Sequence, residues 1–406
     1  MRKLLVPAIV LGLLIGAVGA AGAASSSTPG VSKDEIKVGV TYVDLDAIRS
    51  VTDISHGDYE KSYHAVIDDL NKHGGVNGRK VVPVFAKVNP IGTAPAQEAC
   101  LKLTEDDHMF AVIGFFYFDA PLCYVAQHNT PILGGQITSK NLAQAKAPWT
   151  TLDSGAEVGA RVVDALAKAG ELKGKVGIIT LANDEQGLLN DVVLPALKRN
   201  KIKGTSAILD ASTTDTVAIT QQAGTFLERF KADGVKTVLV VGGAPSTVIS
   251  ALAKTDYRPH LVGTSASTMS GAALNKATDP SVMKGAVTAD IGTDFNDPSL
   301  QKCYRLVEKA TGNKILETPA TGQPDYQASA SSACRYVALF AALAGAAGKS
   351  PTVASFGKAA QKLGSVTIPG SGTITYDPKT HTFVQPMYTY KYDPVAKLMV
   401  KDQPVS

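Results

Sequence analysis

The chain has 406 residues, with 40 Lys and Arg against 36 Asp and Glu and a formal net charge of +4. This near balance excludes the strongly basic surface by which proteins bind nucleic acid or anionic lipid. Charged residues make up 19% of the chain and apolar residues 45%, which is typical of a packed protein and not of a disordered one. A chain of this length is expected to form more than one compact unit.

The first 23 residues have the pattern of a signal peptide. Arg2 and Lys3 precede an apolar run from Leu4 to Ala20, and Ala21-Gly22-Ala23 fits an A-x-A cleavage site. A transmembrane anchor is the alternative, but the run is barely long enough to span a bilayer. No cysteine precedes Cys100, which excludes a lipid-modified N-terminal cysteine. We therefore expect an exported periplasmic or extracellular protein, without stable membrane insertion once residues 1–23 are removed.

Strand and helix patterns then alternate along the chain. Ile36, Val38, Val40 and Tyr42 occupy every second position, which indicates a strand. An apolar stripe over Tyr59–Leu70 predicts a helix that ends at Gly74 and Gly75. Further strands are predicted at Val81–Phe85, Met109–Gly114, Pro131–Gly134, Lys175–Leu181, Ala207–Leu209, Thr237–Gly243 and His260–Gly263. Helices are predicted from about Ala94, at Pro121–Gln127, Gly155–Ala169, Gly187–Arg199 and Thr216–Ala232, and from Pro245.

This alternation predicts an α/β fold with mainly parallel sheets, because strands separated by helices form β-α-β units. The pattern restarts after Trp149-Thr150-Thr151, so we expect two sheets. Val337–Ala347 is too short to cross a membrane and indicates a buried helix. Near the C-terminus, Gly370–Tyr376 and Phe383–Tyr392 are predicted to be consecutive strands with a turn at Asp377-Pro378.

Four cysteines, an even number, favour disulfides in an oxidising compartment. They allow three pairings, of which proximity in the sequence favours Cys100–Cys123 and Cys303–Cys334. Buried free thiols are the alternative. A zinc site is not expected, because neither a C-x-x-C motif nor a histidine-rich spacing accompanies the cysteines.

In open α/β sheets, ligands bind beyond the carboxyl ends of the strands, so the loops that follow the predicted strands are candidate sites. Four consecutive aromatic residues, Phe115 to Phe118, cannot all point into one core, and at least one is expected to line a cleft. Hydroxyl and amide groups beside helix N-termini suit a carboxylate or carbonyl oxygen, although helix capping is their commoner role. The expected ligand-binding residues are Tyr42, Asp44, Phe116, Tyr117, Gln136, Thr138, Asp153, Asp184, Gln186, Ala244 and Ser265.

An enzyme is not expected. The chain has no G-x-G-x-x-G motif after its first strand, no Walker lysine loop, no G-x-S-x-G elbow and no H-E-x-x-H motif. The seven histidines have no metal-ligand spacing. We therefore assign no catalytic residue, metal ligand or cofactor.

Several segments together resemble a known family. They are IKVGV, DLNKHGGVNGRKV, CLKLTEDDHMFAVIG and NTPILGG in the first half, KVGIITLANDEQG and VKTVLVVGGAP in the second, and GTITYDP near the C-terminus. These segments resemble the branched-chain amino-acid (Leu/Ile/Val-type) periplasmic binding proteins, which are type I solute-binding proteins of ABC transporters. The resemblance implies a small-molecule ligand, an ABC transporter permease as partner, and two Rossmann-like lobes that close on the ligand.

The resemblance also implies three hinge crossings between the lobes, which we place near Thr151, Ala286 and Gly372. Lobe 1 would then contain residues 33–151 and 287–372, and lobe 2 residues 152–286 and 373–406. A ligand-sensing receptor of the same fold is the alternative function. The signal peptide, and the absence of a fused kinase or transmembrane module, favour the transport role.

The ligand contacts of the family transfer poorly to this chain. Where amino-acid binders of the family carry serines after the A-V-I-G strand, this chain has Phe116, Tyr117 and Phe118. The family's threonine or serine after the next strand matches Thr138, but a common tyrosine is replaced by Gln186. The acidic residue that binds the ammonium group corresponds to Thr264–Ala266, which has no carboxylate. Because an unpaired ammonium is costly to bury, we expect an apolar or aromatic carboxylate or amide and not a free α-amino acid.

Overall fold

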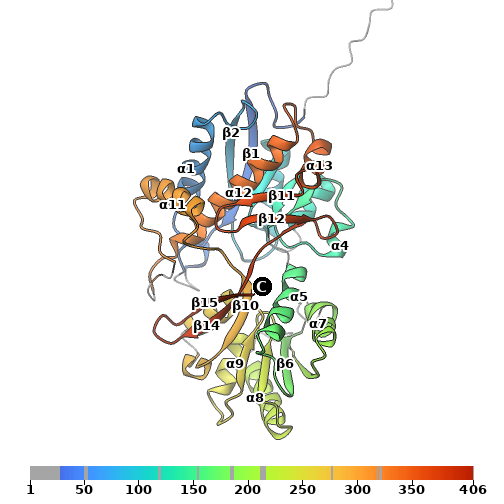
Figure 1. The fold of residues 1–406 in the computed structure, drawn as a ribbon, viewed down its shortest axis with the longest axis vertical. Helices are drawn as coiled ribbons and strands as arrows, with labels where there is room; N and C mark the ends of the chain where they lie inside the picture. The colour runs from blue at the N-terminus through green and yellow to red at the C-terminus, as the bar shows by residue number, and fades with distance from the viewer. Residues whose placement is uncertain are drawn as a thin grey trace, which may run out of the picture.

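The computed structural model describes residues 28–49, 54–117, 120–152, 155–182, 187–210, 216–275, 278–317, 319 and 322–405. The expected signal peptide, residues 1–23, lies outside the described residues. Two lobes follow one another along the long axis of the molecule (Figure 1). None of the helices in the described ranges is long and apolar enough to cross a membrane.

The first lobe is built on a five-stranded parallel sheet of order β2-β1-β3-β4-β5. In the two outermost strand pairs of this sheet, Glu35 lies opposite Lys80 and Ile132 lies opposite Trp149. The strands are β1 (Glu35–Val43), β2 (Lys80–Val88), β3 (Ala111–Gly114), β4 (Ile132–Gly134) and β5 (Trp149–Thr150). The helices in this part of the chain are α1 (Tyr59–Lys72), α2 (Ala94–Leu101), α3 (Ala120–Leu122) and α4 (Ser139–Leu142), with π-helical turns at Lys102–Asp106 and Cys123–Gln127.

The second lobe is built on a seven-stranded mixed sheet of order β15-β14-β10-β9-β8-β6-β7. From β10 to β7 neighbouring strands pair in parallel, whereas β14 pairs antiparallel with both β10 and β15. The strands are β6 (Val176–Leu181), β7 (Gly204–Leu209), β8 (Thr237–Val240), β9 (His260–Gly263), β10 (Val287–Ile291), β14 (Met387–Asp393) and β15 (Leu398–Val405). Its helices are α5 (Gly155–Lys168), α7 (Leu194–Arg199, after a π-helical turn at Leu189–Val193), α8 (Thr216–Ala232), α9 (Pro245–Leu252) and α10 (Ala266–Leu274).

The chain returns to the first lobe between β10 and β14. There α11 (Pro298–Thr311), α12 (Tyr326–Ala346) and α13 (Val353–Leu363) precede a small antiparallel sheet of β11 (Ser365–Ile368), β12 (Gly372–Asp377) and β13 (Thr382–Val384). Val366, Ile368 and Phe383 of this sheet share a buried core with β1, α1 and α12. The expected buried helix at Val337–Ala347 is the C-terminal half of α12.

Buried clusters cover both faces of each large sheet, as the continuous apolar runs predicted. One cluster contains Ile36 and Phe340 and another contains Val112 and Trp149 on the first lobe's sheet. Val240 and Leu239, adjacent on β8, belong to different clusters on the second lobe's sheet. The prediction of an α/β fold with two mainly parallel sheets is therefore confirmed.

Two of the expected lobe boundaries differ from the observed sheets. We placed a crossing near Ala286, but β10 pairs with β9 and β14 of the second lobe, so the chain crosses after Ile291. We placed another near Gly372, but β12 pairs with β11 and β13 beside the first lobe. The strand expected over Phe383–Tyr392 is in fact two strands separated by Gln385 and Pro386, and this break is where the chain crosses.

The three crossings are hydrogen-bonded to one another. At the first crossing the Thr151 N–H donates to the carbonyl of His381 at 3.2 Å, and the Phe383 N–H donates to the carbonyl of Thr151 at 3.0 Å. At the second crossing the Gly292 N–H donates to the carbonyl of Pro386 at 3.2 Å. The lobes are therefore joined by one narrow connection that contains three segments of the chain.

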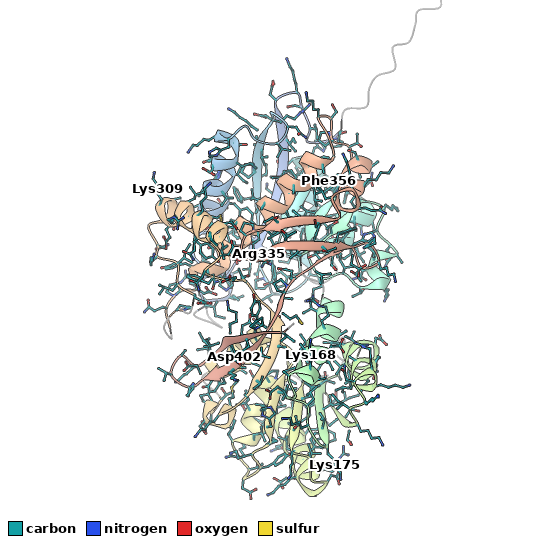
Figure 2. The ribbon with its side chains drawn as sticks, viewed as in Figure 1. Lys168, Lys175, Lys309, Arg335, Phe356 and Asp402 are labelled. Atoms are coloured by element: carbon teal, nitrogen blue, oxygen red, sulfur yellow. A yellow bond between two sulfur atoms is a disulfide. The ribbon has the colours of Figure 1, made fainter. Side chains whose placement is uncertain are left out.

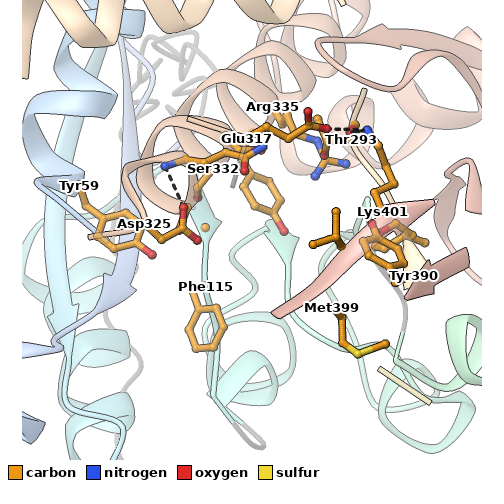
Figure 3. A pocket seen from close by; sticks show the side chains of 17 residues that line it. Tyr59, Phe115, Thr293, Glu317, Asp325, Ser332, Arg335, Tyr390, Met399 and Lys401 are labelled. Carbon is orange, nitrogen blue, oxygen red and sulfur yellow. Dashed lines mark hydrogen bonds and ion pairs between the residues drawn. The ribbon is translucent and has the colours of Figure 1, made fainter. Parts of the chain in front are cut away.

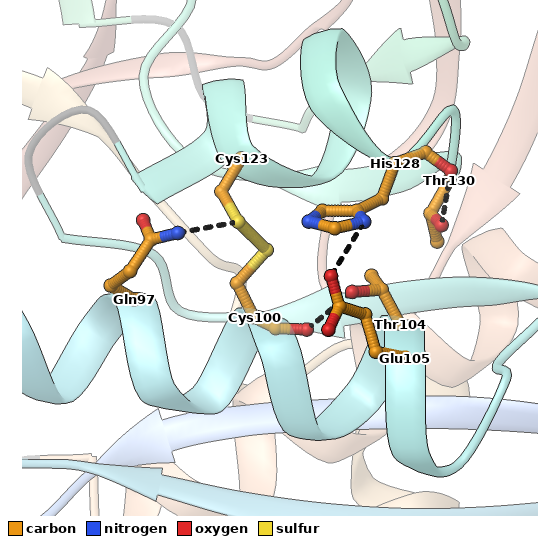
Figure 4. The surroundings of a disulfide bond; sticks show 7 residues. All are labelled: Gln97, Cys100, Thr104, Glu105, Cys123, His128 and Thr130. Atoms are coloured by element: carbon orange, nitrogen blue, oxygen red, sulfur yellow. Dashed lines mark hydrogen bonds and ion pairs between the residues drawn. A yellow bond between two sulfur atoms is a disulfide. The ribbon is translucent and has the colours of Figure 1, made fainter.

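Two disulfides join helical segments of the first lobe, and both match the pairing that sequence proximity favoured. Cys100 is bonded to Cys123 and Cys303 to Cys334. The first lies beside His128, whose Nδ1 is 3.7 Å from the Glu105 carboxylate (Figure 4). The second joins α11 to α12.

Candidate functional site

A pocket of about 530 Å³ lies where the two lobes meet (Figure 3). The first lobe contributes residues of α1, β3 and α12, and the second lobe contributes residues of β10, β14 and β15. This volume falls within the range of pockets that hold small molecules. Its lining residues are Tyr59, Gly114, Phe115, Ile291, Thr293, Glu317, Asp325, Gln327, Ala328, Ser331, Ser332, Arg335, Tyr336, Tyr390, Met399, Val400 and Lys401.

One face of α12 forms a polar wall of the pocket. Ala328, Ser331, Ser332 and Arg335 line it and follow the i, i+3, i+4, i+7 spacing that brings residues to one side of a helix. The opposite side of α12 packs into the core of the lobe through Ala333, Val337 and other apolar residues. At the start of the helix, Asp325 accepts a hydrogen bond from the Gln327 N–H at 3.1 Å.

Aromatic side chains form a second wall in the first lobe. Tyr59 at the start of α1 stacks on Tyr42 with ring centroids 5.3 Å apart. Phe115, directly after β3, lies edge-on to Tyr117 at 4.4 Å and is 44% exposed. Because Tyr59 and Phe115 both line the pocket, they offer apolar faces to a bound molecule.

Lys401 on β15 joins the two lobes across the pocket. Its Nζ lies 3.1 Å from the carboxylate of Glu317, in the segment between α11 and α12. It also donates to the carbonyl of Thr293 at 2.9 Å and lies over the ring of Tyr388. In Figure 3 this ion pair lies on the side of the pocket opposite Tyr59 and Asp325. Lys401 and Glu317 therefore neutralise each other within the chain.

His56 lies next to the aromatic wall, and its Nδ1 is 2.9 Å from the Tyr59 hydroxyl. Burial lowers the pKa of His56 below its ordinary value of 6.5, and the nearby Asp325 charge opposes this effect. The unfolded chain therefore takes up a proton at this position at a higher pH than the folded chain does.

We expect the free energy of unfolding to decrease as pH falls from about 7 to 5, with this histidine contributing up to about 1.4 kcal/mol for each pH unit over which only the unfolded state is protonated. His56→Gln should show a shallower decrease, since glutamine does not titrate. Urea unfolding at pH 7.5, 6.5 and 5.5 measures the difference. Identical slopes for the two proteins would contradict this assignment.

Tyr42, Asp44, Phe116 and Tyr117, which were predicted in the first lobe, are not among the residues that line this pocket. Tyr42 donates to the Glu60 carboxylate at 2.6 Å and supports Tyr59 from behind. Asp44 forms an ion pair with Lys87 at 3.0 Å. Phe116 is 9% exposed and packs edge-on against Tyr124 in the core. Of the two adjacent aromatic residues Phe115 and Phe116, Phe115 lines the pocket and Phe116 does not, because adjacent side chains in an extended chain point in opposite directions.

The other predicted residues take structural positions or are not described. Gln136 is exposed, and Thr138 caps the short helix α4 by accepting from the Asn141 N–H at 3.1 Å. Ala244 is fully buried in the second lobe's core, and Ser265 caps α10. None of these four is among the residues that line the pocket. Asp153, Asp184 and Gln186 lie outside the described residues.

The sequence patterns did not identify α12 or β15 as part of the site. A signal was present, because Ala328, Ser331, Ser332 and Arg335 place small, hydroxyl and cationic groups on one face of an otherwise apolar helix. No local pattern marks Lys401 or Tyr390, since their place at the pocket depends on how β14 and β15 add to the edge of the second sheet.

The fold and site define a two-lobed binding protein with a small-molecule pocket between its lobes. The chain matches the model of the periplasmic binding protein family over residues 35–397, and it belongs to this family. A search of curated proteins found no match.

Solved structures with the same fold cover nearly the whole chain at low identity. An ABC transporter substrate-binding protein from Desulfitobacterium hafniense, in complex with Leu, has a TM-score of 0.66 and 13% identity and covers 91% of this chain and 100% of its own. A fatty acid ABC transporter substrate-binding protein from Thermomonospora curvata has a TM-score of 0.63 and 13% identity, covering 94% and 95%. A solute-binding protein from Rhodopseudomonas palustris BisB5, in complex with 3,4-dihydroxybenzoic acid, has a TM-score of 0.61 and 17% identity, covering 91% and 97%.

Proposed function

We propose that this chain is the exported substrate-binding component of an ABC importer, which captures a small molecule between its lobes and delivers it to a permease. The observation that carries the proposal is the pocket lined by α12 and β3 on one side and by β10, β14 and β15 on the other. A molecule that contacts both walls stabilises the closed arrangement of two lobes joined by a narrow connection. Binding and release would then be the activity, with no chemical step.

We further propose that the ligand has an apolar or aromatic body with a carboxylate or amide, and is not a free α-amino acid. Tyr59 and Phe115 supply apolar faces to the pocket. The two carboxylates that line it are engaged within the chain, Glu317 by Lys401 and Asp325 by the Gln327 N–H. The sequence patterns did not indicate these two carboxylates; one is paired with a cation and the other caps α12.

The similar structures are compatible with either chemistry, because those named above bind leucine, a dihydroxybenzoic acid and, by name, fatty acids. A direct experiment is native mass spectrometry of the gently purified protein, followed by calorimetry with co-purified and candidate ligands. We expect an aromatic or aliphatic acid or amide to bind and leucine, isoleucine and valine not to bind. Micromolar binding of any of these three amino acids would overturn the ligand class, while leaving the capture function standing.

Phe115→Ala tests whether this pocket is the one that holds the ligand. We expect affinity for the identified ligand to fall by roughly 10- to 100-fold, because the substitution removes an aromatic face that contacts the ligand. Phe116→Leu is the control, since Phe116 lies in the core and a large apolar residue is kept there. Unchanged affinity in Phe115→Ala would place the ligand elsewhere.

A further inference from the structure

Arg335 is the cation that lines the pocket without a carboxylate partner among the described residues. The other cation, Lys401, is paired with Glu317 at 3.1 Å. Arg335 extends from α12 near the edge of the first lobe that faces the second (Figure 2). Its Nη2 donates to the Ser371 hydroxyl at 3.3 Å and to the side-chain oxygen of Gln385. No described acceptor lies within hydrogen-bonding distance of its buried Nε.

This arrangement leaves a guanidinium group with neutral neighbours and an unused donor. A partly buried cation is unfavourable unless an anion compensates its lost hydration. Guanidinium has N–H groups in a planar fork that fits the two oxygens of a carboxylate, and such charge-assisted hydrogen bonds are stronger than those between neutral groups. A carboxylate on the bound solute would supply both the missing charge and the missing acceptors.

Arg335 is also connected to the crossings between the lobes through Gln385, which is 2% exposed. The Gln385 side-chain amide donates to the carbonyl of Leu152, at the first crossing, at 2.6 Å. The carbonyl of Gln385 accepts from Arg161 on α5 of the second lobe. A group that binds Arg335 is therefore in contact with a residue that is hydrogen-bonded to Gln385. Gln385 in turn is hydrogen-bonded to Leu152 at the first crossing and to Arg161 of the second lobe.

We propose that Arg335 binds a carboxylate of the solute, so that the ligand of this pocket is an anion. The inference rests on the proposed function and deepens it, since it chooses the carboxylate over the neutral amide. Of the two cations that line the pocket, Lys401 is paired with Glu317, so Arg335 is the one available to a carboxylate of the solute.

The test uses matched acids and amides as probes: benzoate with benzamide, 3,4-dihydroxybenzoate with its amide, and octanoate with octanamide. Calorimetry is performed on the wild type, Arg335→Gln, Arg335→Lys and the control Arg305→Gln, in which the same change is made at an exposed residue of α11. We expect at least one acid to bind the wild type more tightly than its amide. Arg335→Gln should lower affinity for that acid by roughly 10- to 100-fold and remove the preference for it over the amide.

Arg335→Lys keeps the charge without the planar fork and should recover part of the acid preference, whereas Arg305→Gln should bind as the wild type does. Circular dichroism and thermal unfolding establish that each variant is folded. The proposal is overturned if no acid binds the wild type, if an amide binds as tightly as its acid, or if folded Arg335→Gln and Arg335→Lys both keep the full preference. If amides bind and the lobes close on them, only the assignment of an anionic ligand is wrong, and the proposed function stands. The proposed function itself would fall if no probe binds and native mass spectrometry finds no co-purified solute.

Discussion

Gly114→Ala is expected to lower the free energy of unfolding by about 4 kcal/mol, combining backbone strain with a steric clash. Gly114 ends β3 with a φ of +116°, which side chains rarely adopt, and a Cβ at this position would collide with the carbonyl oxygen of Thr41. That oxygen belongs to the neighbouring strand β1 and cannot move unless the two strands separate. Urea unfolding of the variant measures the loss.

Gly285→Ala is the matched control, because Gly285 also has a positive φ, +80°, but a Cβ added there would have no neighbour within 4 Å. It should lose only the backbone contribution, about 1 to 2 kcal/mol. Equal losses in the two variants would show that the close approach of β3 to β1 is not the cause. Because Gly114 also lines the pocket, Gly114→Ala should weaken ligand binding as well, and Gly285→Ala should not.

Removing the disulfide between Cys303 and Cys334 by changing both residues to alanine should lower the free energy of unfolding by about 3 kcal/mol. The bond closes a loop with a sequence separation of 31 residues, and its removal restores conformational freedom to the unfolded chain. It also fixes α11 to α12 immediately beside Arg335. We therefore expect ligand affinity to fall together with stability.

The second disulfide supplies the control for this experiment. Cys100–Cys123 has a similar sequence separation, 23 residues, but lies in a cluster with Leu103 and Trp149, away from α12. Its replacement by two alanines should cost about as much stability with little effect on affinity. Unfolding and calorimetry are both needed, and a stability loss below about 1 kcal/mol in both variants would contradict the assumed role of the crosslinks.

Much of this fold could be predicted because local patterns agree with the structure. The strand predicted at His260–Gly263 and the helix predicted at Thr216–Ala232 match β9 and α8 to the residue. Such segments have clear apolar periods and clear ends. Both disulfides were also the pairs that proximity in the sequence favoured, because each connects elements that are close in the chain and in space.

The third crossing could not be placed from the sequence. Phe383 to Tyr392 has one continuous strand pattern, and only the structure reveals that Gln385 and Pro386 divide it between two sheets. Which sheet β10 joins depends likewise on its partners β9 and β14, more than 20 and nearly 100 residues away. Local periodicity carries no information about such pairings.

The pocket was only partly predictable for the same reason. The rule that ligands bind beyond the carboxyl ends of strands indicated the segment after β3, where Phe115 lines the pocket, although Phe116 and Tyr117 were the residues predicted there. It did not indicate a helix face or an antiparallel edge strand. Arg335 and Lys401 come together only because α12 and β15 approach each other across the junction of the lobes.

Small-angle X-ray scattering of the full-length protein, with and without the ligand identified by native mass spectrometry, tests the central claim most directly. If the two lobes close on the solute, the radius of gyration and the maximum dimension both decrease as the site is saturated. Scattering curves that remain superimposable while calorimetry reports full occupancy would contradict closure of the lobes on the ligand.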